Sequence, residues 1–479
     1  MQRRDFLKTA VLGAAATFPF FGTRTGTAGT RKRPNVVFIL ADDLGYADVG
    51  CYGQKRIKTP NIDRLAAEGM RFTQAYSGNP VCAPSRCTLM TGYHSGHAQV
   101  RGNKQVGEND PWLLGSTTSG QWPLAEGTFT VGRLFKQAGY VTGAFGKWGL
   151  GRVGTSGDPQ KQGFDHFFGY ICQRQAHTYY PNHLWRDGEV LWIEENKDGA
   201  EKVYSHDLIA EESLKFIRSN KDRPFFLYVP STIPHVALQV PEDSLAEYED
   251  QLPDSPYDGK RGYVPHEHPR ACYAGMVTRL DREVGRIMAL LKELGLDDNT
   301  LVIFASDNGP TASGGEDPAF FESAGPLRGL KGSVWEGGVR VPFIARWPGR
   351  IKSGGESDHV CAFWDFLPTC AELLDEQPPA GIDGISILST LLGRSQQQKK
   401  HNYLYWELNN QQSVRMGDWK AVRIKPGQKI QLFNLKTDLG EQKDVAGEHP
   451  DIVARVAEVF TNGRTDCEAF PLQRPKPDR

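Results

Sequence analysis

Four uninterrupted hydrophobic runs are spaced along the first two thirds of the chain. Runs without alternating polar positions are typical of strands that are buried on both faces of a parallel sheet. We therefore predict strands at residues 34–40, 140–145, 224–229 and 300–305.

Between these runs, hydrophobic residues recur at the spacing of an amphipathic helix. Strands that alternate with helices indicate an α/β fold, in which a large, mostly parallel sheet is flanked by helices on both faces. The pattern predicts helices over 60–70, 130–138, 206–218 and 272–294, with Gly295 suited to the end of the last one.

The pattern changes near residue 375. A break at 377–381 contains proline and glycine and precedes four short runs that are typical of a small antiparallel sheet. These runs lie at 402–408, 412–416, 419–424 and 430–434, and a last helix is predicted over about 450–461. We expect a catalytic domain over 30–375 and a smaller C-terminal α+β subdomain over 376–479. We predict that residues 240–270 form a surface excursion, a long segment that runs outside the core.

Composition narrows the classes of function. The chain of 479 residues is 39% hydrophobic and 24% charged, as in a soluble globular enzyme. Its 56 Lys and Arg balance 57 Asp and Glu, which argues against a nucleic-acid partner. Beyond residue 30 no run of 18 apolar residues predicts a membrane span in the mature chain. Eight cysteines are too few for a disulfide scaffold, and the seven besides Cys82 cannot all pair within the chain.

The first 29 residues resemble a bacterial twin-arginine signal peptide. Arg3 and Arg4 precede a short apolar run that is rich in alanine and glycine. This predicts export of the folded protein by the twin-arginine machinery and a periplasmic or secreted location.

Acidic residues follow two of the predicted strands. Asp42 and Asp43 come after the first run, and Asp307 and Asn308 come after the run at 300–305. Because sites form outside the carboxyl ends of parallel strands, we expect these side chains to meet there. Oxygen ligands without clustered His or Cys favour Ca²⁺, or Mg²⁺ in its place. Taken alone, the same residues are also compatible with ordinary turns and helix caps.

One cysteine lies in a specific motif, Cys82-Ala83-Pro84-Ser85-Arg86 followed by Thr91-Gly92. By itself Cys82 is compatible with a buried structural thiol, or with a redox or metal pair with Cys87. The motif resembles the signature of the type I, formylglycine-dependent sulfatases, C-x-P-S-R followed by T-G, which marks a cysteine that is converted to formylglycine (3-oxoalanine).

Further segments are similar to that family along nearly the whole mature chain. They are residues 35–45, Gly146-Lys147-Trp148, residues 163–170, Pro234-His235, residues 330–342 and, in the C-terminal part, residues 415–420 and 432–435. The resemblance implies an arylsulfatase-like sulfuric ester hydrolase with the alkaline phosphatase fold. It also implies a formylglycine-generating enzyme as a partner.

The resemblance further implies roles for individual residues. One Ca²⁺ would be held by Asp42, Asp43, Asp307, Asn308 and the modified Cys82. One hydroxyl of the hydrated formylglycine, activated by the ion and by Asp307, would attack sulfur, and the second would later expel sulfate. Arg86 and Lys147 would compensate charge. His235 and Lys331 would bracket the bridging oxygen, and one of them would protonate the leaving alcohol.

One position departs from the family pattern. The G-K-W motif is commonly followed by a histidine that is thought to assist breakdown of the sulfated intermediate, and here the residue is Gly149. Its task falls either to another side chain, for which His94 and His97 after the cysteine motif are candidates, or to water.

The substrate is indicated only by residues 173–186, which mix polar, basic and aromatic side chains. Arg174 and His177 suit sugar rings that bear anionic groups, although a packed insertion explains the aromatic residues equally well. We predict a sulfated carbohydrate, such as a galactose or N-acetylgalactosamine sulfate, or an aryl sulfate. The alternatives are a formylglycine-dependent phosphonate or phosphodiester hydrolase and a catalytically impaired binding protein.

Overall fold

The computed structural model describes residues 33–107 and 117–472, so the predicted signal peptide at 1–29 lies outside the described residues. The described residues after Lys32 belong to one compact unit. Within these ranges, no helix is long and apolar enough to cross a membrane. All eight cysteines are free thiols, Cys82 included.

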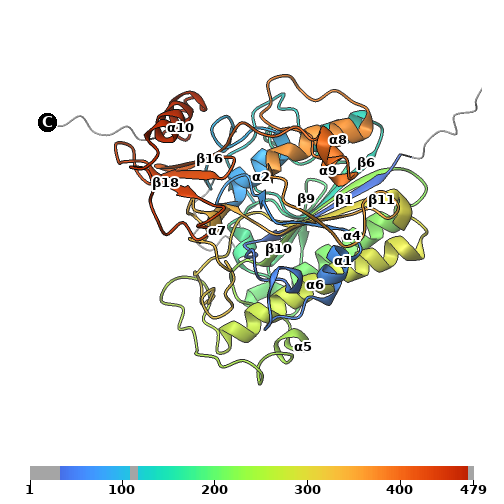
Figure 1. Cartoon of the computed structure of the whole chain (residues 1–479). Helices are drawn as coiled ribbons and strands as arrows, with labels where there is room; N and C mark the ends of the chain where they lie inside the picture. Colours follow the sequence, from blue (N-terminus) through green and yellow to red (C-terminus); the bar gives the residue numbers. More distant parts are fainter. Residues whose placement is uncertain (1–32, 108–116, 473–479) are drawn as a thin grey trace, which may run out of the picture. The chain divides into compact units, whose positions relative to one another are not determined.

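A ten-stranded mixed sheet forms the centre of this unit (Figure 1). Its five middle strands are parallel, and they include all four of the predicted hydrophobic runs. In spatial order the strands are β13 (Gly355–Ser357), β2 (Met70–Phe72), β12 (Phe343–Arg346), β11 (Thr300–Ser306), β1 (Asn35–Asp42), β10 (Phe225–Pro234), β6 (Val141–Lys147), β7 (His166–Tyr170), β8 (His183–Arg186) and β9 (Glu189–Trp192).

Antiparallel pairs flank this parallel centre on both sides, and the edge strand β13 pairs parallel with β2. Strand β12 runs antiparallel to β11 and to β2, while β8 runs antiparallel to β7 and to β9. These edge strands are only three or four residues long, too short to appear as buried runs in the hydrophobic pattern. The mostly parallel sheet predicted from the sequence is therefore confirmed at its centre.

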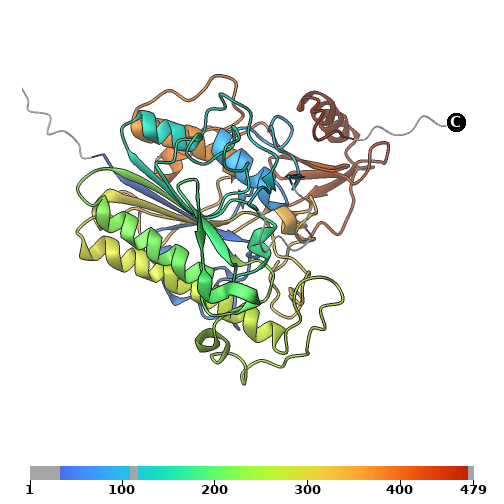
Figure 2. The same ribbon diagram turned by 180° about the vertical axis from the view of Figure 1, so that it is seen from behind.

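Helices cover both faces of the sheet (Figures 1 and 2). Val37, Ile39 and Ala41 of β1 share one core with α1 (Pro60–Ala67), α4 (Ser205–Ser219) and α6 (Pro269–Glu293). Val36, Phe38 and Leu40 share the other core with α2 (Cys82–Thr91), α3 (Val131–Gln137) and α8 (Phe366–Leu374). Short helices are α5 (Glu242–Leu245), within the predicted excursion, α7 (Glu336–Val339) and α9 (Leu388–Leu391).

Helix α2 was not predicted from the sequence, although it carries the cysteine motif. All ten of its residues are buried. A helix that is enclosed on every side has no polar stripe, and so it lacks the amphipathic spacing that identifies surface helices.

A second, four-stranded antiparallel sheet lies near the C-terminus, as predicted. Lys420 of β17 reaches the buried Glu336 of α7 at 3.0 Å, which ties this sheet to the rest of the unit. Its strands are β15 (Leu404–Leu408), β16 (Gln411–Met416), β17 (Trp419–Arg423) and β18 (Gln431–Asn434), and α10 (Pro450–Asn462) contacts β16. Two small pairs join β3 (Ala75–Tyr76) to β14 (Cys361–Ala362) and β4 (Gln105–Val106) to β5 (Gly120–Gln121).

Candidate active site

Four neighbouring parallel strands bring polar side chains to one edge of the sheet. Asp42 ends β1 and Lys147 ends β6, while Asp307 directly follows β11 and His235 directly follows β10. All four side chains are buried, with 3% exposure or less. The carboxyl edge of a parallel sheet is where α/β folds form ligand sites.

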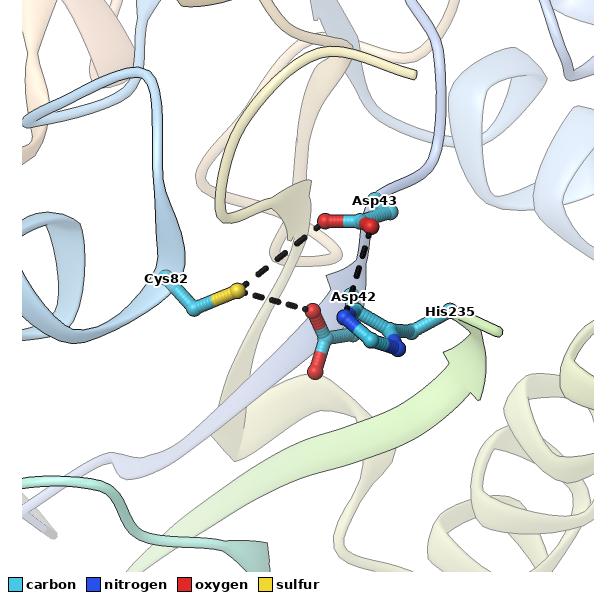
Figure 3. Close-up of side chains that lie close together, drawn as sticks. All are labelled: Asp42, Asp43, Cys82 and His235. Atoms are coloured by element: carbon cyan, nitrogen blue, oxygen red, sulfur yellow. Dashed lines mark hydrogen bonds and ion pairs between the residues drawn. The ribbon is translucent and has the colours of Figure 1, made fainter. Parts of the chain in front are cut away.

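Cys82 faces this edge from the first position of α2 (Figure 3). Its Sγ lies 3.3 Å from Oδ1 of Asp42 and 4.0 Å from Oδ1 of Asp43, and the residue is 1% exposed. Burial, and then the charges of Asp307 and Asp42, raise the pKa of the Cys82 thiol. An unmodified Cys82 therefore holds its proton at neutral pH and is a weak nucleophile.

The acidic residues form a set of oxygen donors beside Cys82. Asp43 has a left-handed backbone with φ of 64°, and its amide N–H donates to Oδ1 of Asp307 at 3.2 Å. The amide nitrogen of Asn308 donates to Oδ1 of Asp43 at 2.8 Å. Oδ1 of Asn308 is buried and has no hydrogen-bond partner among the described residues. Three carboxylates and an unpartnered amide oxygen fit a hard cation such as Ca²⁺ or Mg²⁺.

Three basic side chains face the three acids. Lys147 Nζ lies 2.6 Å from Asp42, and Lys331 Nζ lies 2.7 Å from Asp43. The guanidinium of Arg86, which is fully buried, lies 2.8 Å from Asp307. Because these charges balance, an added divalent cation would leave the cluster positive and able to attract an anionic substrate.

The three carboxyl groups have different pKa values, although all are fully buried. Burial raises the pKa of Asp42, but Lys147 and His235 beside it bring that pKa below its ordinary value. Burial raises the pKa of Asp43 in spite of Lys331. Burial, together with Asp42, raises the pKa of Asp307 to about 6. Strongly perturbed groups of this kind are characteristic of functional sites.

His235 belongs to the same cluster, since one ligand atom each of His235, Cys82, Asp42 and Asp43 lies within 4.8 Å of the others (Figure 3). Its Nε2 lies 3.6 Å from Oδ2 of Asp43, and its Nδ1 bonds the carbonyl of Val236. The His177 ring stacks on the His235 ring with centroids 5.1 Å apart. The predicted substrate residue His177 therefore lies beside the site. Arg174, on the same turn, is partly exposed, and its role stays a prediction.

Tyr263, which lies in the excursion before α6, was not predicted as a site residue. Its ring centroid is 5.1 Å from that of His177 and 6.3 Å from that of His235. Its left-handed backbone, with φ of 68°, is rare for a bulky residue. Strained residues of this kind cluster at functional sites.

Part of the segment at 173–186 packs as core. Tyr179 and Trp185 are buried, and the segment forms β8 and the turn before it. This favours the packed-insertion interpretation for its aromatic residues, whereas His177 faces the site.

His94 and His97 lie with Asp383. The Nδ1 atom of His97 is 3.0 Å from Oδ1 of Asp383, and Nε2 of His94 is 3.5 Å from the same oxygen. The His94 ring stacks on the His97 ring with centroids 4.5 Å apart, and it also contacts the rings of Trp364 and Tyr405. That either histidine replaces a side chain at Gly149 stays a prediction.

Comparisons with known proteins identify the family of the chain. The family model described as Sulfatase matches residues 34–376, and that of the N-sulphoglucosamine sulphohydrolase C-terminal region matches residues 331–463. The chain is 31% identical to the N-acetylgalactosamine-6-sulfatase of Mus musculus, covering 93% of this chain and 83% of that protein. It is 28% identical to the N-acetylgalactosamine-6-O-sulfatase of Bacteroides thetaiotaomicron, covering 91% and 94%.

Solved structures extend the similarity to the whole fold. The crystal structure of Ps i-CgsB in complex with k-i-k-neocarrahexaose has a TM-score of 0.73 at 29% identity, and the match covers 91% of this chain and 94% of that one. The fold is that of the alkaline phosphatase-like sulfatases. Together with the family match over residues 34–376, these findings show that the chain belongs to the sulfatase family and is a sulfuric ester hydrolase.

Proposed function

We propose that this sulfatase removes sulfate from a sulfated carbohydrate, with galactose or N-acetylgalactosamine sulfates as the first candidates, and that it also accepts aryl sulfates. The observation that carries the proposal is the contact between Cys82 and Asp42 within a buried cluster of balanced acids and bases. The names of the relatives, N-acetylgalactosamine-6-sulfatases, support the choice of sugars.

The proposed nucleophile is formylglycine made from Cys82. Its hydrated aldehyde supplies one hydroxyl to attack sulfur and a second to expel sulfate, a step that serine or cysteine would leave to water. Asp307 is proposed to take the proton of the attacking hydroxyl, since a general base must lie within reach of the nucleophile. Arg86 keeps that carboxylate in place through two hydrogen bonds, of 3.1 and 2.8 Å.

The remaining residues are assigned two tasks at the substrate, compensation of negative charge and transfer of a proton. Lys147 and Arg86 would offset the negative charge that gathers around the nucleophile and the sulfate. His235 and Lys331 would bracket the bridging oxygen, and one of the two would protonate the leaving alcohol. Lys331 is the most exposed of the three basic groups, at 16%, which suits a residue that meets substrate.

We assign the metal to Asp42, Asp43, Asp307 and Asn308, together with the modified Cys82. A bound Ca²⁺ would supply charge stabilisation for the sulfate oxygens and lower the pKa of a bound hydroxyl. The unpartnered Oδ1 of Asn308 supports this assignment, because buried polar atoms are normally paired.

Replacing Asp43 with asparagine is expected to weaken Ca²⁺ binding by ~10- to 100-fold, since the change removes one ligand charge without changing its shape. Calorimetric titration of EDTA-treated protein measures the affinity. Asp48→Asn is the matched control, because Asp48 is an equally buried acid outside the proposed ligand set. Equal Ca²⁺ affinity in Asp43→Asn and in the unaltered protein would contradict the assignment.

The activity is tested with matched esters. We expect kcat/KM for 4-nitrophenyl sulfate to exceed that for 4-nitrophenyl phosphate and for an aryl phosphonate monoester by at least about 100-fold, since the site balances charge for a monoanion. Sulfated galactose and N-acetylgalactosamine, each with sulfate at position 4 or 6, then identify the sugar. A preference for the phosphonate would support the phosphonate hydrolase alternative. Binding of sulfated sugars without turnover would support the impaired binding protein.

We also propose that the chain is modified by a formylglycine-generating enzyme and exported through the twin-arginine machinery to the periplasm or beyond. The paired Arg3 and Arg4 support this route. Twin-arginine export carries folded proteins, so the modification of Cys82 would be completed in the cytoplasm, before export.

A further inference from the structure

The side chain of Gln173 occupies the space beside Gly149. A Cβ atom built on Gly149 would lie 2.6 Å from Nε2 of Gln173 and 2.8 Å from its Cδ. The φ of Gly149 is 78°, a left-handed conformation that glycine adopts without strain. Glycine at 149 and glutamine at 173 therefore form one packed pair, in which the amide fills the volume that any side chain at 149 would need.

The amide of Gln173 is buried and incompletely bonded. The residue is 5% exposed, and its Nε2 has no hydrogen-bond partner in residues 33–107 and 117–472. Its backbone is fixed, because its N–H donates to Oε1 of the buried Gln121 at 2.7 Å. A rigidly held, buried donor without an acceptor needs an explanation, and a bound ligand that supplies the acceptor is one.

Two connections link the segments that carry Gly149 and Gln173 to the catalytic cluster. On one side, Gly149 comes two residues after Lys147, and the Trp148 N–H bonds the Tyr170 carbonyl at 2.9 Å where β6 and β7 end. On the other side, Gln173 leads into the turn that carries His177, whose ring stacks on His235. The packed pair of Gly149 and Gln173 therefore belongs to two segments that each reach the cluster, one through Lys147 and the other through His177.

We propose that Gln173 is a substrate-positioning residue that donates its amide N–H to an oxygen of the sulfate group, and that Gly149 is required to leave room for it. The ligand class is a tetrahedral oxyanion, either a sulfate ester or free sulfate. The inference rests on the proposed sulfate substrate for its ligand. An uncharged donor binds the oxyanion without disturbing the balance of positive and negative charge among Lys147, Arg86 and the acids.

The test compares Gln173→Ala and Gln173→Glu in the full-length, modified protein. Two quantities are measured: the dissociation constant for inorganic sulfate by calorimetry, and kcat/KM for 4-nitrophenyl sulfate. We expect Gln173→Ala to lose ~10- to 100-fold in both. Gln173→Glu has the same shape, and it should lose more because its carboxylate repels sulfate. Gln162→Glu, at another buried glutamine, controls for burying a charge.

A double-mutant cycle tests the pairing with Gly149. Gly149→Ala should weaken sulfate binding by displacing the amide. In the Gln173→Ala background the space is empty and only the backbone strain of alanine at a φ of 78° remains, so Gly149→Ala should lower stability there but add little to the loss of sulfate affinity. Additive losses would overturn the pairing. Sulfate affinity within twofold of the unaltered protein in both Gln173 variants would overturn the inference. If no sulfate ester is turned over but sulfate binds and Gln173→Glu abolishes binding, the proposed activity fails while this inference stands.

Discussion

Replacing Cys82 with alanine is expected to lower kcat/KM for 4-nitrophenyl sulfate by at least about four orders of magnitude, because loss of the nucleophile leaves only the surrounding electrostatics. The protein should remain folded, since a buried cysteine and an alanine differ by one sulfur atom. Residual activity and thermal unfolding are measured on protein made with a formylglycine-generating system.

Two further measurements make this result specific. Mass spectrometry of the tryptic peptide 72–86 should show an aldehyde at position 82 in the unaltered protein. Cys87→Ala is the control, because Cys87 is equally buried on the same helix and should keep both the modification at Cys82 and the activity. A thiol at Cys82 in fully active protein would contradict the formylglycine nucleophile.

Replacing Arg86 with alanine is expected to lower the free energy of unfolding by about 3–5 kcal/mol, the usual cost of removing one partner from a buried ion pair. Arg86 is fully buried and bonds Asp307 at 2.8 Å and Asp42 at 3.2 Å, and its Nη1 donates to the Lys147 carbonyl. Without it, two buried carboxylates lose their shared cation. Denaturant unfolding measures the change.

Calcium distinguishes this explanation from a simple packing defect. Millimolar Ca²⁺ should restore part of the stability of Arg86→Ala, because a bound cation replaces the missing positive charge and binds only the folded state. Arg86→Lys keeps the charge but loses the planar guanidinium, so its free energy of unfolding should lie between those of Arg86→Ala and the unaltered protein. If Arg86→Ala unfolds at the same denaturant concentration as the unaltered protein, the ion pairs do not stabilise the fold.

The local pattern predicted the central elements well. The runs at 34–40 and 300–305 became β1 and β11, since a strand that is buried on both faces must be apolar at nearly every position. The acids after those strands could be placed together because parallel strands end at one edge. The edge strands β2 and β12 and the enclosed helix α2 were missed, since short or fully buried elements carry no periodic signal.

The α/β class, the apolar strands and the special position of Cys82 could all be predicted without the structure, because they depend on residues that are near one another along the chain. Contacts between side chains that are far apart along the chain became visible only in the folded protein. Lys147 pairs with Asp42 across 105 positions, and Lys331 pairs with Asp43 across 288. Such contacts depend on the order of strands in the sheet, which is fixed by burial of the whole core. The packing of Gln173 over Gly149 and of Tyr263 on His177 has the same origin.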